Sequence, residues 1–228
     1  MLFSDCLKFE FCFFNSSRNK LHIEEYKNHW YDGWFYDKLI APNQDRLFVE
    51  IKNLIQPNSK VLDVGCGTGR FSFFIADKVE TVVGIDLSKK NIETANKSLS
   101  KKENTKITFH HSDIAKIKSS YEHFDYAVMT YVIHEVNPDK RIALLNEMAM
   151  IADKIIIGDY LVPVEKGFWS LLNEIVEYLA GREHYSNFKN FVMNKGLLGL
   201  VDQSRLKLIS EIKNKPATSQ LLVLKSTN

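Results

Sequence analysis

The residues best placed for chemistry form a glycine-rich turn. Asp63, Val64, Gly65, Cys66, Gly67, Thr68 and Gly69 follow an apolar run and precede a helical pattern. Glycine permits positive φ angles and close approach of the backbone to a ligand. The N-terminus of the following helix offers free N–H groups and positive potential. The spacing G-x-G-x-G differs from the G-x-G-x-x-G of dinucleotide sites. Asp63 would repel a pyrophosphate and suits a ligand that carries an ammonium group.

Two further carboxylates follow later apolar runs. Asp86 comes directly after Thr81–Ile85, and Asp113 comes shortly after Ile107–His111. An acidic residue at the end of a second strand can accept hydrogen bonds from both ribose hydroxyls, and one after a third strand can accept from the exocyclic amine of adenine. Any one of these features alone is ordinary. Their order and spacing together predict a site for a nucleoside cofactor.

The elements that position these residues alternate between short β-branched runs and helical patterns. This alternation predicts a parallel sheet with crossover helices. Asn43, Ser88 and Asn137 are expected to cap helices, and Pro138 favours the first helical position. Helical patterns also cover Phe168–Leu179, Tyr185–Asn194 and Leu197–Gln203. The predicted strands are Lys60–Val64, Thr81–Ile85, Ile107–His111, Phe124–Met129, Lys154–Asp159, Leu206–Lys213 and Gln220–Lys225, the last two forming a hairpin.

These motifs resemble those of class I S-adenosylmethionine-dependent methyltransferases. Asp63–Gly69 resembles the first motif, Gly84–Ser88 the second, Ser112–Ile114 the third and Phe124–Glu135 the fourth-strand motif. Ala180–Phe188 also looks like small bacterial members. The resemblance implies a doubly wound α/β fold with helices on both faces of a mostly parallel seven-stranded sheet. The implied strand order is 3-2-1-4-5-7-6, with strand 7 antiparallel.

The resemblance also implies roles for individual residues. Gly65 and Gly67 would lie against the cofactor, and Asp63 would lie near its ammonium group. Asp86 would bind the ribose, while Asp113 and Ile114 would address adenine. Thr130 and Tyr131 would line the methionine end. The full implied set for S-adenosyl-L-methionine, with S-adenosyl-L-homocysteine as product, is Asp63, Gly65, Cys66, Gly67, Thr68, Gly69, Asp86, Leu87, Asp113, Ile114, Thr130 and Tyr131; no metal is expected.

The methyl acceptor is less evident, because methyl transfer needs mainly orientation and exclusion of water. His134 follows the fourth strand, where ligands of such sheets bind, and we predict that it faces the acceptor as a base or orienting group. Tyr36, His184 and Tyr185 are further candidates for substrate contact, and Tyr36-Asp37 or Tyr31-Asp32 could close over the cofactor or simply pack as core. Met129–Val132 stands where base-methylating enzymes carry an Asp/Asn-Pro-Pro-aromatic motif. A small-molecule acceptor is therefore expected, and nucleic acid is not.

Composition agrees with a single globular domain. The 228 residues carry a net charge of +2, without the basic excess of a nucleic-acid binder. The sparse cysteines Cys6, Cys12 and Cys66 predict no disulfide framework and favour a cytoplasmic location. No apolar run suggests a signal peptide or a membrane span. We expect a lead-in and lid over 1–42, a methyltransferase domain over 43–228, and a helical cap insertion around 161–182.

Two alternatives stay open at this point. A methyltransferase-like module that binds cofactor or a partner without catalysis would keep the same motifs. An NAD-binding oxidoreductase would share the strand–turn–helix arrangement, although the glycine spacing and Asp63 disfavour it.

Overall fold

A mixed seven-stranded sheet forms the centre of the molecule. The computed structural model describes residues 41–102, 104–121, 123–163, 174, 177–179, 181–214 and 218–227. The strand order is β3-β2-β1-β4-β5-β7-β6, as expected. β7 pairs antiparallel with both β5 and β6, and the other neighbours are parallel. The strands are β1 (Lys60–Val64), β2 (Thr81–Asp86), β3 (Ile107–His111), β4 (Phe124–Thr130), β5 (Ala152–Tyr160), β6 (Leu206–Lys213) and β7 (Ser219–Ser226).

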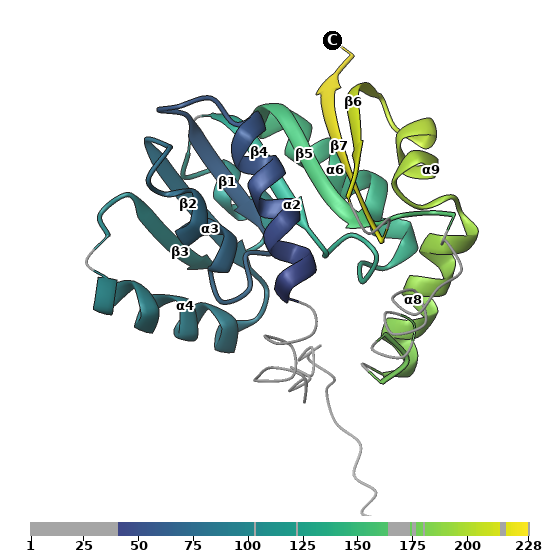
Figure 1. The fold of residues 1–228 in the computed structure, drawn as a ribbon, viewed down its shortest axis with the longest axis horizontal. Coiled ribbons are helices and arrows are strands. Elements are labelled where there is room, and N and C mark those ends of the chain that lie inside the picture. The colour runs from purple at the N-terminus through teal and green to yellow at the C-terminus, as the bar shows by residue number, and fades with distance from the viewer. Residues whose placement is uncertain are drawn as a thin grey trace, which may run out of the picture.

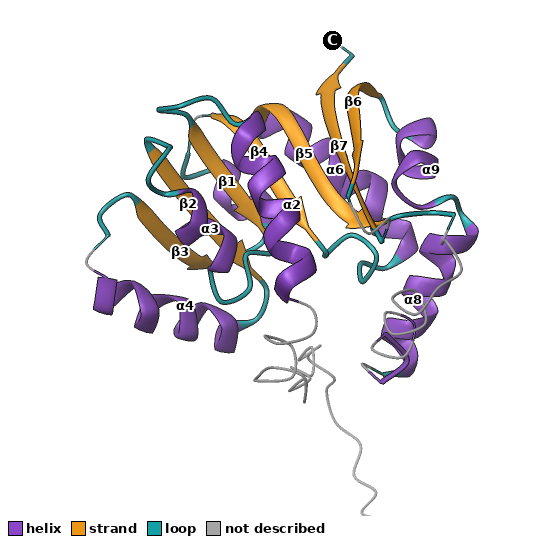
Figure 2. Ribbon diagram, viewed as in Figure 1, coloured by secondary structure: helices purple, strands orange, loops and turns teal. Residues whose placement is uncertain are grey.

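Helices cover both faces of this sheet. In Figures 1 and 2, α2 and α3 lie in front of the strands and α6 lies behind them. α4 and α8 lie along the lower edge in the same view. The described helices are α2 (Ala41–Leu54), α3 (Arg70–Ile75), α4 (Lys89–Lys102), α5 (Ile114–Lys118), α6 (Pro138–Ile151), α8 (Arg182–Met193) and α9 (Gly196–Gln203).

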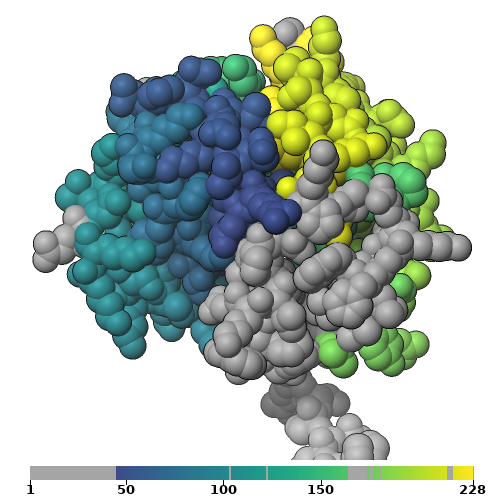
Figure 3. Space-filling view, viewed as in Figure 1, coloured from purple at the N-terminus to yellow at the C-terminus, as the bar shows by residue number. Residues whose placement is uncertain are grey.

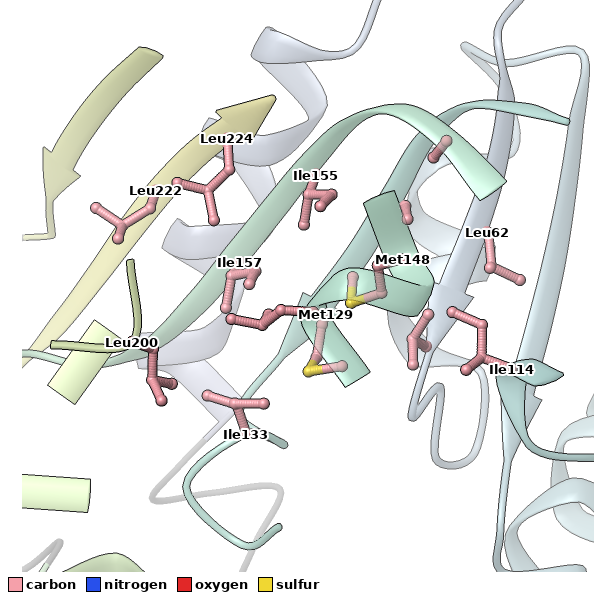
Figure 4. Packing of buried hydrophobic residues seen from close by; sticks show 14 of the residues in the cluster. Leu62, Ile114, Met129, Ile133, Met148, Ile155, Ile157, Leu200, Leu222 and Leu224 are labelled. Carbon is pink, nitrogen blue, oxygen red and sulfur yellow. The ribbon is translucent and has the colours of Figure 1, made fainter. Parts of the chain in front are cut away.

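Two apolar clusters, one on each face, hold the helices to the sheet. Successive strand residues point to opposite faces, so Leu62 and Ile155 belong to one cluster and Val61 and Ile156 to the other. Figure 4 shows the first cluster, in which Met129 of β4 lies close to Met148 of α6. The strands therefore read as almost continuous apolar runs, as is typical of sheets buried on both faces.

Two of the three residues predicted to cap helices do so in the structure. The Asn137 side chain accepts from the backbone N–H of Asp139, and the Ser88 hydroxyl accepts from that of Asn91. The prediction that Asn43 caps a helix was wrong, because α2 already begins at Ala41.

Four of the observed strands, β2, β4, β5 and β7, extend by one or two residues beyond the predicted bounds, and the other three match them. β5 spans Ala152–Tyr160 instead of Lys154–Asp159, because Ala152 pairs with Phe124 of β4 and Tyr160 pairs with Ser219 of β7. Neighbouring strands, which the local pattern does not reveal, decide where a central strand ends.

The chain termini and the predicted cap are only partly described. Tyr36, Tyr31 and the other residues of 1–40 fall outside the described residues, while residues 41 and 42 of the predicted lid belong to α2. Of the cap expected around 161–182, residues 161–163, 174, 177–179, 181 and 182 are described, and 174, 177–179 and 182 are helical. The domain boundaries therefore stay predictions.

No helix within the described ranges is long and apolar enough to cross a membrane. Figure 3 shows α2 between the N-terminal half of the sheet and the yellow C-terminal hairpin.

Candidate functional site

The glycine-rich turn begins at the carboxyl end of β1. Gly65, Gly67 and Gly69 have φ angles of 72°, 55° and 83°, in the region that favours glycine. The backbone N–H groups of Gly65 and Cys66 donate to the carbonyl of Ile85 at 2.8 and 2.9 Å, which anchors the turn to β2. A Cβ on Gly65 would lie 2.5 Å from Val132, whereas one on Gly67 would meet no atom of the described residues within 4 Å. The turn is thus packed beneath Gly65 and open at Gly67.

Asp86 holds the turn in this shape from the end of β2. Its Oδ2 accepts from the Gly67 N–H at 2.9 Å, and its Oδ1 accepts from the Ser88 N–H at 2.7 Å. The sequence did not predict these contacts, because they depend on the fold of the turn. An ionised carboxylate offers about four lone-pair sites, so Asp86 can accept further hydrogen bonds from a ribose.

Asp63 lies under the turn, with only 1% of its surface exposed. Its Oδ2 accepts from the hydroxyl of Ser72 in α3 at 2.6 Å. Burial raises the pKa of Asp63 to about 7, and the Ser72 hydrogen bond opposes this rise. Burial also raises the pKa of the Cys66 thiol, which keeps it protonated. Sequence reasoning missed Ser72, because a serine within an apolar helix carries no signal of its partner.

The residues predicted to address adenine have structural contacts of their own. The Asp113 Oδ1 caps α5 by accepting from the Lys116 N–H at 2.9 Å. Ile114 is 4% exposed and packs in the first apolar cluster, while Leu87 is 65% exposed. Leu87 follows β2, and Asp113 and Ile114 follow β3, as expected; the cofactor contact of Leu87 and the adenine contacts of Asp113 and Ile114 stay predictions.

Thr130 and Tyr131 lie at the carboxyl end of β4. Tyr131 has a φ of 55°, which is uncommon for a residue with a side chain, and its N–H donates to the carbonyl of Gly158 at 2.8 Å. Its ring meets that of Tyr160 edge-on at 5.7 Å. This contact connects the predicted methionine end of the cofactor site to a polar cluster beyond β4 and β5.

His134 is the centre of that polar cluster. Its Nδ1 lies 2.7 Å from the Oδ1 of Asp159, and its side chain is 2% exposed. Because a carboxylate only accepts, Nδ1 carries the proton and donates. Nε2 has no hydrogen-bond partner in the described part of the chain. The Oε1 atoms of Glu177 and Glu135 lie 3.5 and 3.8 Å from it, at ion-pair distances.

His184 and Glu177 complete the cluster from distant parts of the sequence. The Nε2 of His184 pairs with the Oε2 of Glu177, while the hydroxyl of Tyr160 donates to Oε1 of Glu177 at 2.7 Å. Burial alone would raise the pKa of Glu177, but the neighbouring imidazoles of His134 and His184 outweigh it and lower that pKa. Burial alone would lower the pKa of His134, yet the Asp159 carboxylate raises it well above its usual range.

Only some of the residues predicted to contact the substrate lie close together. His134 and His184 come together, with ring centroids 5.8 Å apart. Tyr185 does not join them, because its hydroxyl donates to Glu174 at 2.8 Å and its ring meets Tyr178. Tyr36 lies outside the described residues. The sequence analysis did not select Glu177, Asp159 or Tyr160, because nothing local to them indicates their shared location.

Arg141 of α6 fixes the frame around the cluster. Its guanidinium, in a residue that is 2% exposed, donates to the carbonyls of His134, Val136 and Asn187 at 3.0, 2.9 and 2.7 Å. The Asn187 amide donates in turn to the carbonyl of Glu135 at 2.9 Å. These bonds tie the loop after β4 to α8, which carries His184.

Comparison with known proteins adds to this geometry. Residues 61–153 match the family described as methyltransferase domain. A segment of 80 residues is 39% identical to the ubiquinone biosynthesis O-methyltransferase of Pelagibacter ubique. This segment covers 35% of this chain and 32% of that protein. A segment of 42 residues is 60% identical to phosphoethanolamine N-methyltransferase 1 of Arabidopsis thaliana, and it covers 18% of this chain and 8% of that protein. The matched segments thus span under a third of the length of these curated relatives.

Similarity to solved structures extends over most of the fold. The magnesium protoporphyrin IX methyltransferase of Synechocystis PCC 6803 with bound SAH superposes with a TM-score of 0.61 at 18% identity, covering 86% of this chain and 90% of that one. At this identity the likeness concerns the fold, and it agrees with the observed strand order. Residues 61–153 thus match a methyltransferase domain, and the strand order is that of the class I S-adenosylmethionine-dependent methyltransferase fold.

Proposed function

We propose that this chain transfers the methyl group of S-adenosyl-L-methionine to a small-molecule acceptor by in-line displacement. The observation that carries the proposal is the turn held open at Gly67 by Asp86. The hydrogen bond from the Gly67 N–H to Asp86 fixes the carboxylate beside the turn, and a Cβ on Gly67 would meet no described residue within 4 Å. This combination of a fixed acceptor and free space supports binding of a nucleoside.

The binding roles follow the order of the carboxyl ends along the sheet. Asp86 would bind the ribose, the end of β3 with Asp113 would receive adenine, and Thr130 and Tyr131 would border the methionine end. Asp63 supports the turn from below through Ser72, and its carboxylate would favour the ammonium group of the cofactor. These assignments are proposals that the binding experiments below test.

The charge beyond β4 supports a small acceptor that is neutral or cationic. Glu135, Asp159 and Glu177 gather around two imidazoles there. Such a concentration of carboxylates would repel the phosphates of a nucleic acid. The two curated relatives are named for methylation in ubiquinone biosynthesis and of phosphoethanolamine, both small molecules.

The proposed function predicts where a labelled methyl group will appear. The full chain, S-adenosylmethionine labelled in the methyl group and a cell extract divided by size should yield label in the small-molecule fraction. A matched reaction with Asp86→Ala should lose most of this label. Label confined to RNA or protein would contradict the proposed acceptor class. Tight binding of S-adenosylhomocysteine without any transfer would instead favour the non-catalytic module.

The alternative of an NAD-binding oxidoreductase has no support from the family match. It predicts tight binding of NAD, which calorimetry on the same preparation would detect. We expect S-adenosylhomocysteine to bind stoichiometrically, with no measurable binding of NAD.

A further inference from the structure

His134, Glu177 and His184 come from three separate segments, the loop after β4, the helical residues around position 177, and the first turn of α8. Each contributes one atom suited to bind a metal, and these atoms all lie within 4.8 Å of one another. Two of the residues are buried and the third is half-buried. We propose that these three residues form a binding site for a divalent transition-metal ion, with Glu135 at its exposed side.

The spacing of the side-chain atoms fits such an ion. Metal–ligand bonds of about 2.0–2.1 Å in a tetrahedral zinc site place ligand atoms roughly 3.3 Å apart. The Nε2 of His134 lies 3.5 Å from Oε1 of Glu177 and 3.8 Å from Oε1 of Glu135. The Nε2 of His184 lies 3.9 Å from the same Glu135 oxygen. An ion between these atoms requires only small side-chain movements.

The state of His134 provides independent support. Its buried Nε2 is aimed into the cluster but has no hydrogen-bond partner among the described residues. Buried polar atoms are seldom left in this condition. The Asp159 carboxylate accepts a hydrogen bond from Nδ1 of His134, and it also accepts from the backbone N–H groups of His134 and Tyr160 at 3.3 and 2.7 Å. A carboxylate that fixes a histidine in this way is the usual outer support of a metal ligand.

Charge also favours a cation at this place. Asp159 and Glu177 are fully or almost fully buried, and Glu135 borders them. Buried carboxylates need compensating positive charge, which a divalent ion supplies to the whole cluster. The two imidazoles distinguish the expected ion from Mg²⁺ and Ca²⁺, which prefer oxygen ligands. Zn²⁺, Co²⁺ and Fe²⁺ accept mixed imidazole and carboxylate ligands.

The same burial disfavours His134 as a simple general base. A base must lie within hydrogen-bond reach of the proton that it removes, and the His134 side chain is 2% exposed with Nε2 facing Glu177 and Glu135. The Tyr160 ring contacts both the His134 ring at 4.8 Å and the ring of Tyr131 at 5.7 Å, so the two proposed sites are joined through an aromatic side chain and share no ligand. Cofactor binding and metal binding should therefore be separable.

The test uses the full chain after treatment with a chelator. Titration with Zn²⁺ in a calorimeter should show one ion per chain, Co²⁺ should develop the visible absorption of a low-coordinate nitrogen and oxygen site, and Mg²⁺ should not bind. His184→Ala and Glu177→Gln should weaken Zn²⁺ binding by at least about 100-fold, and Asp159→Asn by about 10- to 100-fold through its support of His134.

His123→Ala is the matched control, because His123 is an exposed histidine that also lies 2.9 Å from an aspartate, Asp153. It should leave Zn²⁺ affinity unchanged. Binding of S-adenosylhomocysteine should persist in the chelated protein and in His184→Ala, which shows that the variant is folded. Absence of stoichiometric Zn²⁺ and Co²⁺ binding, or equal affinity in His184→Ala and the parent, would overturn the site. Neither result would affect the proposed methyl transfer.

Discussion

Replacement of Asp86 by alanine separates the two roles that the structure gives this carboxylate. In the free protein it accepts from the N–H groups of Gly67 and Ser88 at 2.9 and 2.7 Å. Water can replace part of both bonds, because Asp86 is only half-buried. We expect the free energy of unfolding to fall by about 1–2 kcal/mol, below the full value of two charged hydrogen bonds.

The expected loss of cofactor affinity is larger. Two hydrogen bonds from ribose hydroxyls to a carboxylate are worth ~1.5–3 kcal/mol each before water replacement, so Asp86→Ala should weaken binding by about 2–4 kcal/mol. This corresponds to a Kd for S-adenosylhomocysteine raised roughly 30- to 700-fold. Calorimetry measures the Kd, and thermal unfolding on the same preparation measures the stability.

Asp125→Ala is the control for this experiment. Its carboxylate also accepts from a strand N–H, that of Lys60 at 2.6 Å, but at the amino end of β1. We expect a small loss of stability and no change in Kd. A cofactor analogue without the ribose 2′-hydroxyl completes a double-mutant cycle. If Asp86→Ala is folded and its Kd lies within threefold of the parent, or if the cycle shows no coupling, Asp86 does not bind the ribose.

Three other perturbations test the site and its frame. Burial raises the folded-state pKa of Asp63 from 3.8 to about 7, so the stability that the protonated carboxyl provides is present below pH 4 and is lost as pH rises through 7. Asp63→Asn should therefore be more stable than the parent at pH 8, by at most about 4 kcal/mol, and differ little from it at pH 4. Equal stability gains at pH 4 and pH 8 in urea unfolding would show that Asp63 has an ordinary pKa. Gly67→Ala should cost roughly 1–2 kcal/mol of stability because of the positive φ, and it should lower cofactor affinity at least tenfold by filling the open side of the turn. Gly65→Ala should lose more stability, because its Cβ would lie 2.5 Å from Val132. Unchanged affinity in folded Gly67→Ala would place the cofactor elsewhere. Arg141→Met should lower the free energy of unfolding by about 3 kcal/mol or more, since three backbone carbonyls lose their donor. Lys189→Met, which replaces an exposed lysine, should lower it by under about 1 kcal/mol. Similar losses for the two variants would mean that Arg141 does not hold α8 to the loop after β4.

Local patterns along the chain were sufficient to predict the fold and the cofactor class. Apolar runs such as Lys60–Val64 and Ile107–His111 gave the strands with their observed bounds, because a strand buried on both faces leaves a continuous local signal. Asp86 ends its run, Asp113 follows one, and Asp63 stands one residue before the end of Lys60–Val64, so parallel pairing alone brings them to one edge of the sheet. Caps such as Asn137 were readable for the same reason, since they act on N–H groups two or three residues away.

Only the tertiary structure decided what lies beyond that edge. His134, Asp159, Glu177 and His184 are separated by up to dozens of residues, and no local period relates them. They meet because Arg141 joins the loop after β4 to α8 and because β5 places Asp159 beside that loop. The contacts of Asp86 with Gly67 and of Asp63 with Ser72 likewise depend on how the turn folds back on its neighbours. Local pattern therefore defined the sheet and its cofactor edge, whereas long-range packing of side chains formed the polar cluster in which we propose a metal.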